Sequence, residues 1–427
     1  MKKTIIVIGA GQRGAFAYVP YALDNGDQLQ VVGVAEPVDV KREYMCKTYG
    51  IAEENCYTTW ETCLEREKFA DAVLISTQDR LHFEPAMKAV EKGYDILLEK
   101  PMSPLPEECV KIRNAAKEAG VKVLVCHVLR YTSHYRKIKE IVDSGRLGDI
   151  VHIVHTENVG DYHHAHSYVR GNWNNSETSA PMILAKSCHD VDLLRWIIGK
   201  KCKKVSAFGS LKYFHKGHKP EGAPKRCIEG CPHGEVCPYN ALKAYYEDKN
   251  NLWFRGVAAD CPGPTDEQVL EAIKTGPYGR CVFQCDNNVV DHMVVNMEFE
   301  DEVTAAFTMS AFSPRIARES IIMGTKGHLR SDMEKEEIIV TDFLTRTEEV
   351  IDTKNALFGH TGHGGGDEGI IRDFIDVLNG EEITDRVTGV EISCESHMIA
   401  FAAEESRLTG KVIDMDEYYE AMNGGKS

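Results

Sequence analysis

Short runs of apolar residues alternate with longer, mixed stretches over the first 126 residues of the chain. Ile5–Ile8 is a continuous, β-branched run, which is typical of a strand buried on both faces of a parallel sheet. Further strands are predicted over Val31–Ala35, Ala72–Ile75, Asp95–Leu98 and Val121–Cys126, with helices over Val40–Tyr49, His82–Lys92 and Pro106–Ala119. Strands that alternate with helices predict βαβ units and a doubly wound parallel sheet, the α/β class.

The pattern changes after residue 126. The apolar runs there predict strands over Ile150–Val154, Val289–Phe299, Val303–Met309, Arg318–Met323 and Glu337–Thr341. They predict helices over Glu368–Leu378 and Val390–Thr409. Between about residues 212 and 285 this pattern is interrupted by a polar segment. We therefore expect two domains, residues 1–126 and 127–427, and an insert of about 212–285 in the second.

Composition narrows the possible partners. The 427 residues carry a net charge of −16, so the surface repels phosphate backbones and anionic membranes, and we expect no nucleic acid and no membrane as partners. The first apolar run ends at Gly9, too early for a signal peptide, and no stretch approaches the roughly 18 apolar residues of a membrane helix. We expect a cytoplasmic protein whose 14 cysteines are reduced or metal-bound.

A glycine-rich turn follows the first strand. Residues 9–14 read Gly-Ala-Gly-Gln-Arg-Gly, the pattern G-x-G-x-x-G. Gly9 permits the tight turn, Gly11 allows close approach of a pyrophosphate, and Gly14 lets the helix pack near the strand. The backbone N–H groups at the helix start, next to Gln12 and Arg13, then face the phosphates. Pro20 is expected to kink or shorten this first helix.

Glu36 ends the second predicted strand, about 20 residues after the glycine turn. A carboxylate at that place binds the two ribose hydroxyls of an NAD adenosine and repels the 2′-phosphate of NADP. The sequence therefore predicts NAD as the cofactor. The alternative is a solvated strand end without a ligand.

Lys100 follows another strand, where ligands of parallel sheets bind. An ammonium there stabilises a developing alkoxide, and a lysine whose pKa is lowered by burial and by a cationic cofactor accepts a hydroxyl proton. The alternative is a surface lysine before a turn proline. The Lys100–Pro101 bond is a candidate cis peptide.

The loop after Ile150–Val154 is rich in polar and aromatic residues. These suit a sugar, with hydroxyls on polar groups and the sugar ring on an aromatic face, and the candidates are His166, Arg170, Asn172 and Trp173. Its three closely spaced histidines leave a metal site open, and a polar surface loop is the third possibility.

A helix is predicted to begin near Cys188, with His189 in its first turn. An imidazole titrates near neutrality and can accept a hydroxyl proton, although a capping role is the alternative. Lys186 lies just before it. A second polar motif, residues 360–367, contains three consecutive glycines between His363 and Asp367, so His363 is a further candidate at the substrate mouth and Asp367 a candidate helix cap.

The motifs Glu99-Lys100-Pro101, residues 76–82, residues 188–192 and the Gly324–Gly327 turn together resemble the Gfo/Idh/MocA family. The resemblance implies NAD(P)-dependent oxidoreduction of sugars or cyclitols by a Rossmann domain and a second domain with a large, mostly antiparallel open sheet. It also implies that Thr77, Gln78, His82, Glu99 and Lys100 serve the cofactor. It makes His189 the acid/base or orienting residue, and makes a homo-oligomer, dimer or tetramer, the expected assembly.

The chain departs from the family at one catalytic position. Many members carry an aspartate four residues before the histidine, where this chain has Ala185. Lys186 is adjacent and is our candidate for a second cation beside the substrate. The usual arrangement of aspartate, histidine and lysine is therefore in doubt here.

The insert contains six cysteines. A structural zinc site is predicted from four of the thiols of Cys227, Cys231, Cys237, Cys281 and Cys285, because a loop-rich insert without its own core needs a staple. An iron–sulfur cluster and free thiols are the alternatives.

The combined hypothesis is a hydride transfer between NAD and a ring carbinol of a sugar, glycoside or cyclitol, with Lys100, His189 and Lys186 as catalytic residues. Two alternatives remain open: an NAD-using glycoside hydrolase or lyase that oxidises its substrate transiently, and a non-catalytic sugar and NAD sensor.

Overall fold

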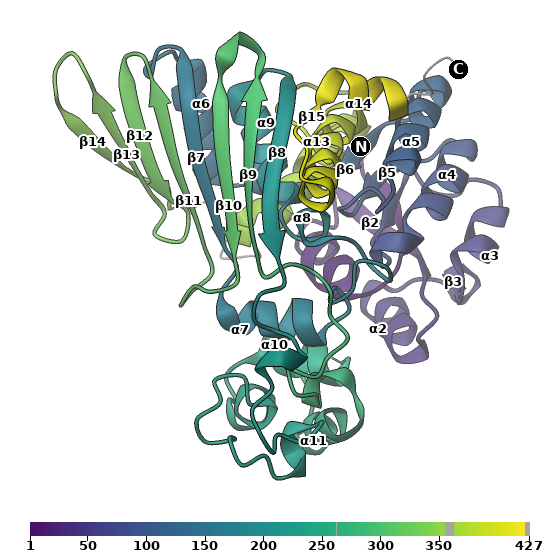
Figure 1. The fold of residues 1–427 in the computed structure, drawn as a ribbon. Coiled ribbons are helices and arrows are strands. Elements are labelled where there is room, and N and C mark those ends of the chain that lie inside the picture. Colours follow the sequence, from purple (N-terminus) through teal and green to yellow (C-terminus); the bar gives the residue numbers. More distant parts are fainter. Residues whose placement is uncertain (262, 355–362, 423–427) are drawn as a thin grey trace.

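The computed structural model describes residues 1–261, 263–354 and 363–422 (Figure 1). Its first sheet is parallel and six-stranded, in the order β3-β2-β1-β4-β5-β6. The strands are β1 (Lys3–Ile8), β2 (Leu29–Ala35), β3 (Cys56–Tyr57), β4 (Ala72–Ile75), β5 (Asp95–Leu98) and β6 (Val123–Val125). The strand order reverses between β1 and β4, which places a ligand crevice at their carboxyl ends.

Helices cover both faces of this sheet. They are α1 (Tyr21–Asp24), α2 (Asp39–Tyr49), α3 (Trp60–Glu65), α4 (Phe83–Glu91) and α5 (Pro106–Ala119). The first helix is interrupted as predicted: a π-helical turn over Gly14–Tyr18 is followed by α1, which begins after Pro20. Proline cannot donate an N–H to the preceding turn, so the helix restarts there.

The second sheet is mixed and nine-stranded, in the order β14-β13-β12-β11-β7-β10-β9-β8-β15. Only the β10 and β7 pair is parallel among its described strands. The strands are β7 (Ile150–Asn158), β8 (Cys202–Ser210), β9 (His292–Phe299), β10 (Thr304–Ser310), β11 (Ala317–Gly324), β12 (Gly327–Asp332), β13 (Glu337–Asp342), β14 (Glu348–Asp352) and β15 (Ile413–Asp414). The predicted fold class is confirmed, although β8, β12, β14 and β15 were not foreseen.

Helices α6 (Ser133–Asp143), α9 (Cys188–Ile198), α13 (Val390–Thr409) and α14 (Met415–Met422) contact strands of the nine-stranded sheet. The second domain also contains α7 (Asp161–His164), which lies below the strands in Figure 1, α8 (Met182–Ala185) and α12 (Gly366–Leu378). Helix α13 contacts both α5 and β8, and α12 shares a core with the first sheet through Ile370 and Phe374. The two halves therefore form one continuous body.

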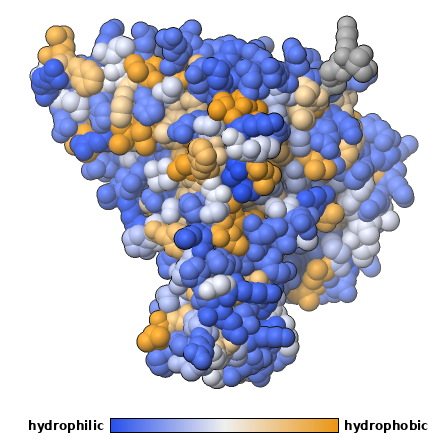
Figure 2. Space-filling model, in the orientation of Figure 1, coloured by the Kyte–Doolittle hydropathy of each residue, from blue (hydrophilic) through white to orange (hydrophobic). Residues whose placement is uncertain are grey.

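The opposite face of the nine-stranded sheet is open. Residues of β9 alternate between buried and exposed along the strand, and Figure 2 shows apolar and polar side chains interspersed over this face. Phe208 on β8 is 65% exposed and lies opposite Val294 on β9. This alternation is the expected signature of a sheet packed on one side only.

The insert projects beyond the lower ends of the strands (Figure 1) and contains α10 (Leu252–Ala259) and α11 (Asp266–Thr275). The expectation that it lacks a core is wrong. Tyr245, Phe254, Val269 and Ile273 form a small buried cluster inside it, and Phe214 belongs to another. Aromatic packing thus supplies the stability for which a metal was invoked.

The predicted zinc site is not supported. Among the residues that the structure describes, no group of three or more histidine, cysteine or acidic side chains could hold a metal ion. The five cysteines proposed as ligands are free thiols there, and four of them, Cys227, Cys231, Cys237 and Cys281, border a second, small cavity.

A disulfide joins Cys46 and Cys56 at the edge of the first sheet, where the sequence predicted reduced thiols. The two residues lie at the end of α2 and the start of β3, which the sheet brings together. In the described ranges, none of the helices combines the length and the apolar character needed to cross a bilayer.

Candidate active site

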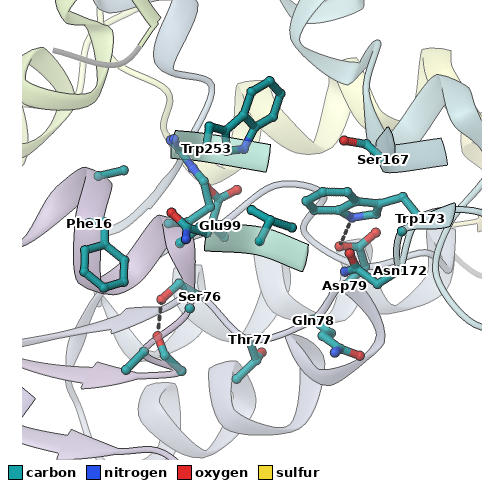
Figure 3. A pocket seen from close by; sticks show the side chains of 18 of the residues that line it. Phe16, Ser76, Thr77, Gln78, Asp79, Glu99, Ser167, Asn172, Trp173 and Trp253 are labelled. Atoms are coloured by element: carbon teal, nitrogen blue, oxygen red, sulfur yellow. Dashed lines mark hydrogen bonds and ion pairs between the residues drawn. The ribbon is translucent and has the colours of Figure 1, made fainter. Parts of the chain in front are cut away.

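A cavity of about 2110 Å³ opens at the carboxyl ends of the Rossmann strands (Figure 3). One part of its wall is the glycine turn, Glu36 and the segments after β4 and β5. The other part comes from the second domain and from α10 of the insert. The cavity therefore lies where three parts of the chain meet.

The glycine turn fits a dinucleotide. Gly9 has φ = +88°, and a Cβ there would lie 2.8 Å from the carbonyl oxygen of Ser76. A Cβ on Gly14 would lie 2.4 Å from the carbonyl oxygen of Gly9. A Cβ on Gly11 would meet nothing within 4 Å, so this backbone faces open space, as close approach of a pyrophosphate requires.

Glu36 is buried at the end of β2 and faces the glycine turn. Its carboxylate accepts hydrogen bonds from the backbone N–H of Ala10 at 2.7 Å and of Val38 at 3.0 Å. Each carboxylate oxygen has a further lone pair. The position therefore suits the ribose hydroxyls of a dinucleotide.

Arg13 is held by carboxylates rather than left free for phosphate. Its Nε donates to Glu99 at 2.8 Å and its Nη2 to Asp367 on α12 at 2.6 Å. Burial alone would raise the pKa of Glu99, but the Arg13 guanidinium holds it below its usual value. Arg13 thus connects the first domain to α12, while Gln12 remains exposed on the cavity wall.

The segment after β4 divides into lining and supporting residues. Thr77 and Gln78 line the cavity. His82 is 1% exposed, and its ring nitrogens lie 2.7 Å from the Pro101 oxygen and 3.1 Å from the Thr77 oxygen. His82 therefore ties two cavity loops together instead of contacting a ligand.

Lys100 reaches across to the second domain. Its Nζ donates a hydrogen bond of 2.6 Å to the carbonyl oxygen of Ala185 and lies 5.9 Å from the Trp173 ring centre. The ammonium of Lys100 is thus hydrogen-bonded to a backbone oxygen at Ala185, the position where the sequence departs from the expected aspartate. The Lys100–Pro101 peptide is cis, as the sequence suggested.

Lys186 belongs to a buried network of charges. Its Nζ lies 3.2 Å from Oε1 of Glu157, whose Oε2 is 2.7 Å from Nε of Arg318. The same Nε is 2.8 Å from Oδ1 of Asp190. Burial lowers the pKa of Lys186, and the Glu157 carboxylate opposes part of that shift. The network keeps a cation at the cavity wall beside Lys100.

His189 lies in the first turn of α9 and is 5% exposed. Its ring centre is 5.8 Å from that of His127 and 6.1 Å from that of His363. Its Nδ1 has no hydrogen-bond partner among the described residues. Burial, followed by the nearby Lys100 charge, lowers the pKa of His189, so the imidazole is neutral and able to accept a proton at neutral pH.

Two of the predicted substrate ligands have packing roles. His166 is 2% exposed and stacks on Phe254 of the insert, with ring centres 4.0 Å apart. Arg170 is also 2% exposed and donates to the carbonyl oxygens of Tyr239 at 2.6 Å and Arg280 at 2.8 Å. The ring face of His166 and the N–H donors of Arg170 therefore contact the insert and hold it against the second domain.

His166 and Arg170 still border the cavity, and the other predicted substrate residues line it as well. Asn172 is exposed on its wall, and Trp173 is fixed there because its Nε1 donates to Asp79 at 3.1 Å (Figure 3). His363 lies 3.2 Å from Asp367, which also pairs with Arg13 and is not a helix cap. Residues 360–362 of the same motif lie outside the described residues.

Sequence reasoning missed three contributors. Asp79 binds both Trp173 and Ser179, Glu157 binds Lys186, and Trp253 of the insert lines the cavity. Glu157 occupies a buried position of β7, where a carboxylate requires a cationic partner, but this burial is visible only in the folded structure. No local pattern indicates Trp253.

Comparisons with known proteins cover both domains. Residues 3–127 match the family model described as "Oxidoreductase family, NAD-binding Rossmann fold", and residues 135–231 match that of the "GFO/IDH/MocA C-terminal domain".

Curated relatives include oxidoreductases and a hydratase. The chain is 23% identical to the oxidoreductase YteT of Bacillus subtilis (strain 168), over 99% of this chain and 100% of that protein. It is 24% identical to the 2,7-anhydro-N-acetylneuraminate hydratase of Escherichia coli (strain K12), over 48% of this chain and 51% of that protein. It is 28% identical to the inositol 2-dehydrogenase of Streptomyces avermitilis, over 51% of this chain and 59% of that protein.

Solved structures share the fold. An Agrobacterium radiobacter oxidoreductase, in complex with NAD+, L-tartaric acid and magnesium, has a TM-score of 0.69 and 14% identity, covering 98% of this chain and 99% of that one. The aldose-aldose oxidoreductase of Caulobacter crescentus, complexed with glycerol, has a TM-score of 0.66 and 14% identity, covering 97% of this chain and all of that one.

Proposed function

Because the chain belongs to the Gfo/Idh/MocA family of oxidoreductases, we propose that it transfers a hydride between NAD and a ring carbinol of a sugar, glycoside or cyclitol. One observation carries this proposal: Lys100, Lys186 and His189 border the same cavity as the glycine turn. The names of the inositol dehydrogenase and aldose-aldose oxidoreductase relatives support this substrate class.

His189 serves as the base for the carbinol hydroxyl. Its imidazole is buried, and its lowered pKa keeps it neutral, so a ring nitrogen is available to take the proton. Asp192, three residues along the same helix, forms two bonds of 2.6 Å with Arg130 and does not compete for this proton. It anchors the helix that carries His189.

Lys100 and Lys186 supply positive charge to the carbinol oxygen. A cation beside that oxygen stabilises the negative charge that develops as the proton leaves. The Ala185 carbonyl orients Lys100, and Glu157 orients Lys186. The Lys100, Lys186 and His189 set also favours an enzyme over a non-catalytic sensor, which needs no acid–base groups.

The nucleotide is held by the first domain. Gly9, Gly11 and Gly14 admit its pyrophosphate, Glu36 its adenosine ribose, and Thr77 and Gln78 border the path toward Lys100. The chemistry that bound NAD supplies is acceptance of the carbinol hydride. Glu36 favours NAD over NADP because its carboxylate would repel a 2′-phosphate.

The test is a panel of sugars, glycosides and inositols incubated with NAD or NADP and followed by nicotinamide absorbance and by product analysis. We expect NADH to form with at least one polyol and NAD to be preferred. Failure of every polyol to change the absorbance or yield a product, with NAD bound, would reject an enzyme and leave the sensor.

A redox-neutral hydrolase or lyase with retained NAD is the second candidate. Lys41 of α2 and Asp260 at the end of α10 form an ion pair of 2.8 Å, and both residues line the cavity. The insert thus reaches over the nucleotide end, which favours slow exchange of the cofactor. A relative named as a hydratase supports the same candidate. Protein purified with bound NAD that converts glycosides without added nucleotide would establish it.

We also propose a homo-oligomer through the open face of the nine-stranded sheet. Exposed apolar residues on that face, which include Phe208 and Val294, form a surface suited to association. Light scattering coupled to gel filtration measures the mass, and Phe208→Lys is expected to dissociate the assembly. A wild-type protein that runs as a monomer contradicts this proposal.

A further inference from the structure

The insert contributes a large aromatic side chain, Trp253, to the wall of the cavity. Trp253 is 44% exposed, whereas the adjacent Phe254 is 3% exposed. Phe254 stacks on His166 at an interplanar angle of 9°, so it fixes α10 against the second domain. The helix is thereby held with nearly half of the Trp253 side chain accessible beside the cavity, although burial of that apolar surface would be favourable.

Trp253 ends a continuous wall of aromatic rings. Trp173 is 6.1 Å from Tyr168, Tyr168 is 5.8 Å from His163, and His163 is 5.1 Å from Trp253, measured between ring centres. All four residues line the cavity. Trp173 stands beside Lys100 at the reacting end, so Trp253 lies two intervening rings away from it.

The cavity is larger than one sugar requires. Its volume of about 2110 Å³ exceeds the roughly 1,000 Å³ upper range of sites for small molecules. The nucleotide end, from the glycine turn to Glu36, accounts for one part of this space. In Figure 3, Trp253 lies on the opposite side of the pocket from Thr77 and Gln78, so the cavity extends between the wall that carries these two residues and the indole.

From these observations we infer that Trp253 forms a second sugar subsite and that the substrate is a glycoside with at least two rings. The reacting ring lies between Lys100 and Trp173, and the second ring stacks its C–H face on the indole of Trp253. This inference rests on the proposed function and names its substrate class. A free monosaccharide or an inositol fills only the reacting subsite.

The physical basis is the removal of the indole face from water. A sugar ring has an apolar face of C–H groups and a rim of hydroxyls, so stacking buries apolar surface while the hydroxyls keep polar contacts. Exposed Asn172 on the same wall offers an amide to that rim. Because the stacked ring does not react, this contact acts on substrate binding more than on the chemical step.

The experiment compares wild-type protein with Trp253→Ala and Trp253→Phe. The probes are maltose, cellobiose, lactose, melibiose and gentiobiose, each set against its free monosaccharides, with NAD present. Binding is measured by calorimetry and turnover by nicotinamide absorbance and product analysis. For the preferred disaccharide we expect Trp253→Ala to raise KM and Kd about tenfold, and Trp253→Phe to raise them about threefold.

Leu252→Ala is the matched control. Leu252 is the preceding residue of the same helix, is 70% exposed and does not line the cavity among the described residues. It should leave both constants within twofold of wild type. Circular dichroism and thermal melting check that every variant is folded, and NAD affinity should be the same in all of them.

Each outcome bears on the subsite separately from the proposed function. A selective loss for disaccharides in Trp253→Ala supports the subsite. Equal losses for monosaccharides and disaccharides, or wild-type protein that uses monosaccharides or inositols and none of the disaccharides, overturns the subsite while the oxidoreductase function stands. Binding and turnover of neither class would overturn both.

Discussion

The two ends of the cavity are built in opposite ways. The nucleotide end uses the ends of neighbouring parallel strands, and its residues Gly9, Gly11 and Glu36 all lie within 28 residues of one another. The substrate end joins Lys100 to Lys186 and His189, and adds Trp253 from an insert. One end is a local βαβ unit, and the other is assembled from segments far apart in the chain.

The two ends of the cavity also differ in their titratable side chains. Of the 17 histidines in the chain, all but His82 lie beyond residue 126, and several of them are buried around the substrate end. At the nucleotide end, Arg13 and Glu99 form a direct ion pair. The nucleotide end therefore combines backbone geometry with paired charges, whereas the substrate end also contains buried histidines, so protonation affects it more.

His189→Ala should give the largest effect. Loss of a positioned base is expected to lower kcat by about 10²- to 10⁴-fold. NAD affinity should hardly change, because His189 lies at the substrate end. Steady-state kinetics and calorimetric NAD titration measure the two quantities. Unchanged turnover would refute the role of His189, and a parallel loss of NAD affinity would show that the two ends are not separable.

Glu36→Gln tests the nucleotide end. Removing the charge is expected to weaken NAD binding about tenfold and to improve NADP binding, since hydrogen bonds to a charged group are worth about 1.5–3 kcal/mol. Dissociation constants for both nucleotides are the measurement, and substrate KM at saturating NAD is the control. If wild-type protein binds NAD and NADP equally, the Glu36 carboxylate does not select the cofactor.

Glu157→Gln tests whether the Glu157 carboxylate keeps Lys186 protonated at the substrate end. The Glu157 carboxylate opposes the lowering of the Lys186 pKa that burial causes, so its removal should lower that pKa further. If protonated Lys186 is required, the alkaline limb of the kcat/KM profile moves to lower pH by about one unit. Lys186→Met should abolish that limb. An identical profile in wild type and Glu157→Gln would contradict the pairing.

Acid should destabilise the substrate side first. Burial lowers the pKa of His127 and His164 to about 4, and of His166 and His397 to about 3, below the usual value of 6.5. The unfolded chain therefore binds more protons between these values. The free energy of unfolding therefore decreases as pH falls below about 6.5, by up to about 1.4 kcal/mol per pH unit for each histidine.

Thermal melting at pH 7 and pH 5 measures this loss, and hydrogen exchange locates it. We expect a lower Tm at pH 5 and earlier exchange in residues beyond 126 than in the first sheet. Equal Tm values at the two pH values would show that these histidines do not control stability.

Lys41→Ala should give the smallest effect. Its partner Asp260 is 72% exposed, and exposed ion pairs contribute about 0–1 kcal/mol. We expect NAD dissociation to accelerate about two- to threefold, with kcat unchanged. Stopped-flow dissociation measures the rate, and high salt should remove the difference. An unchanged rate at low salt would mean that the insert does not retain the nucleotide.

The boundaries of several elements were predictable. The strands Ala72–Ile75 and Asp95–Leu98 and the helices Pro106–Ala119 and Val390–Thr409 coincide with the sequence prediction, because apolar runs with clear end signals fix them. Strand β8 was not predictable, because its sequence mixes polar and apolar residues and its partner β9 is distant in the chain.

The candidate site was predictable only where a motif fixes the backbone. Glu36 faces the glycine turn because both follow adjacent parallel strands. His166 and Arg170 have the composition of a sugar site, yet the folded insert takes their faces and donors. Residue type states what a side chain can bind, and packing decides whether it is available.

The parallel sheet, the glycine-rich turn and the places of Lys100 and His189 at strand and helix ends follow from the sequence alone, because they depend on contacts between near neighbours. Three contacts could be read only from the folded chain: Lys100 donates to Ala185, Glu157 pairs with Lys186, and the insert places Trp253 on the cavity wall. These contacts join residues distant in the chain, and their positions depend on how whole elements pack.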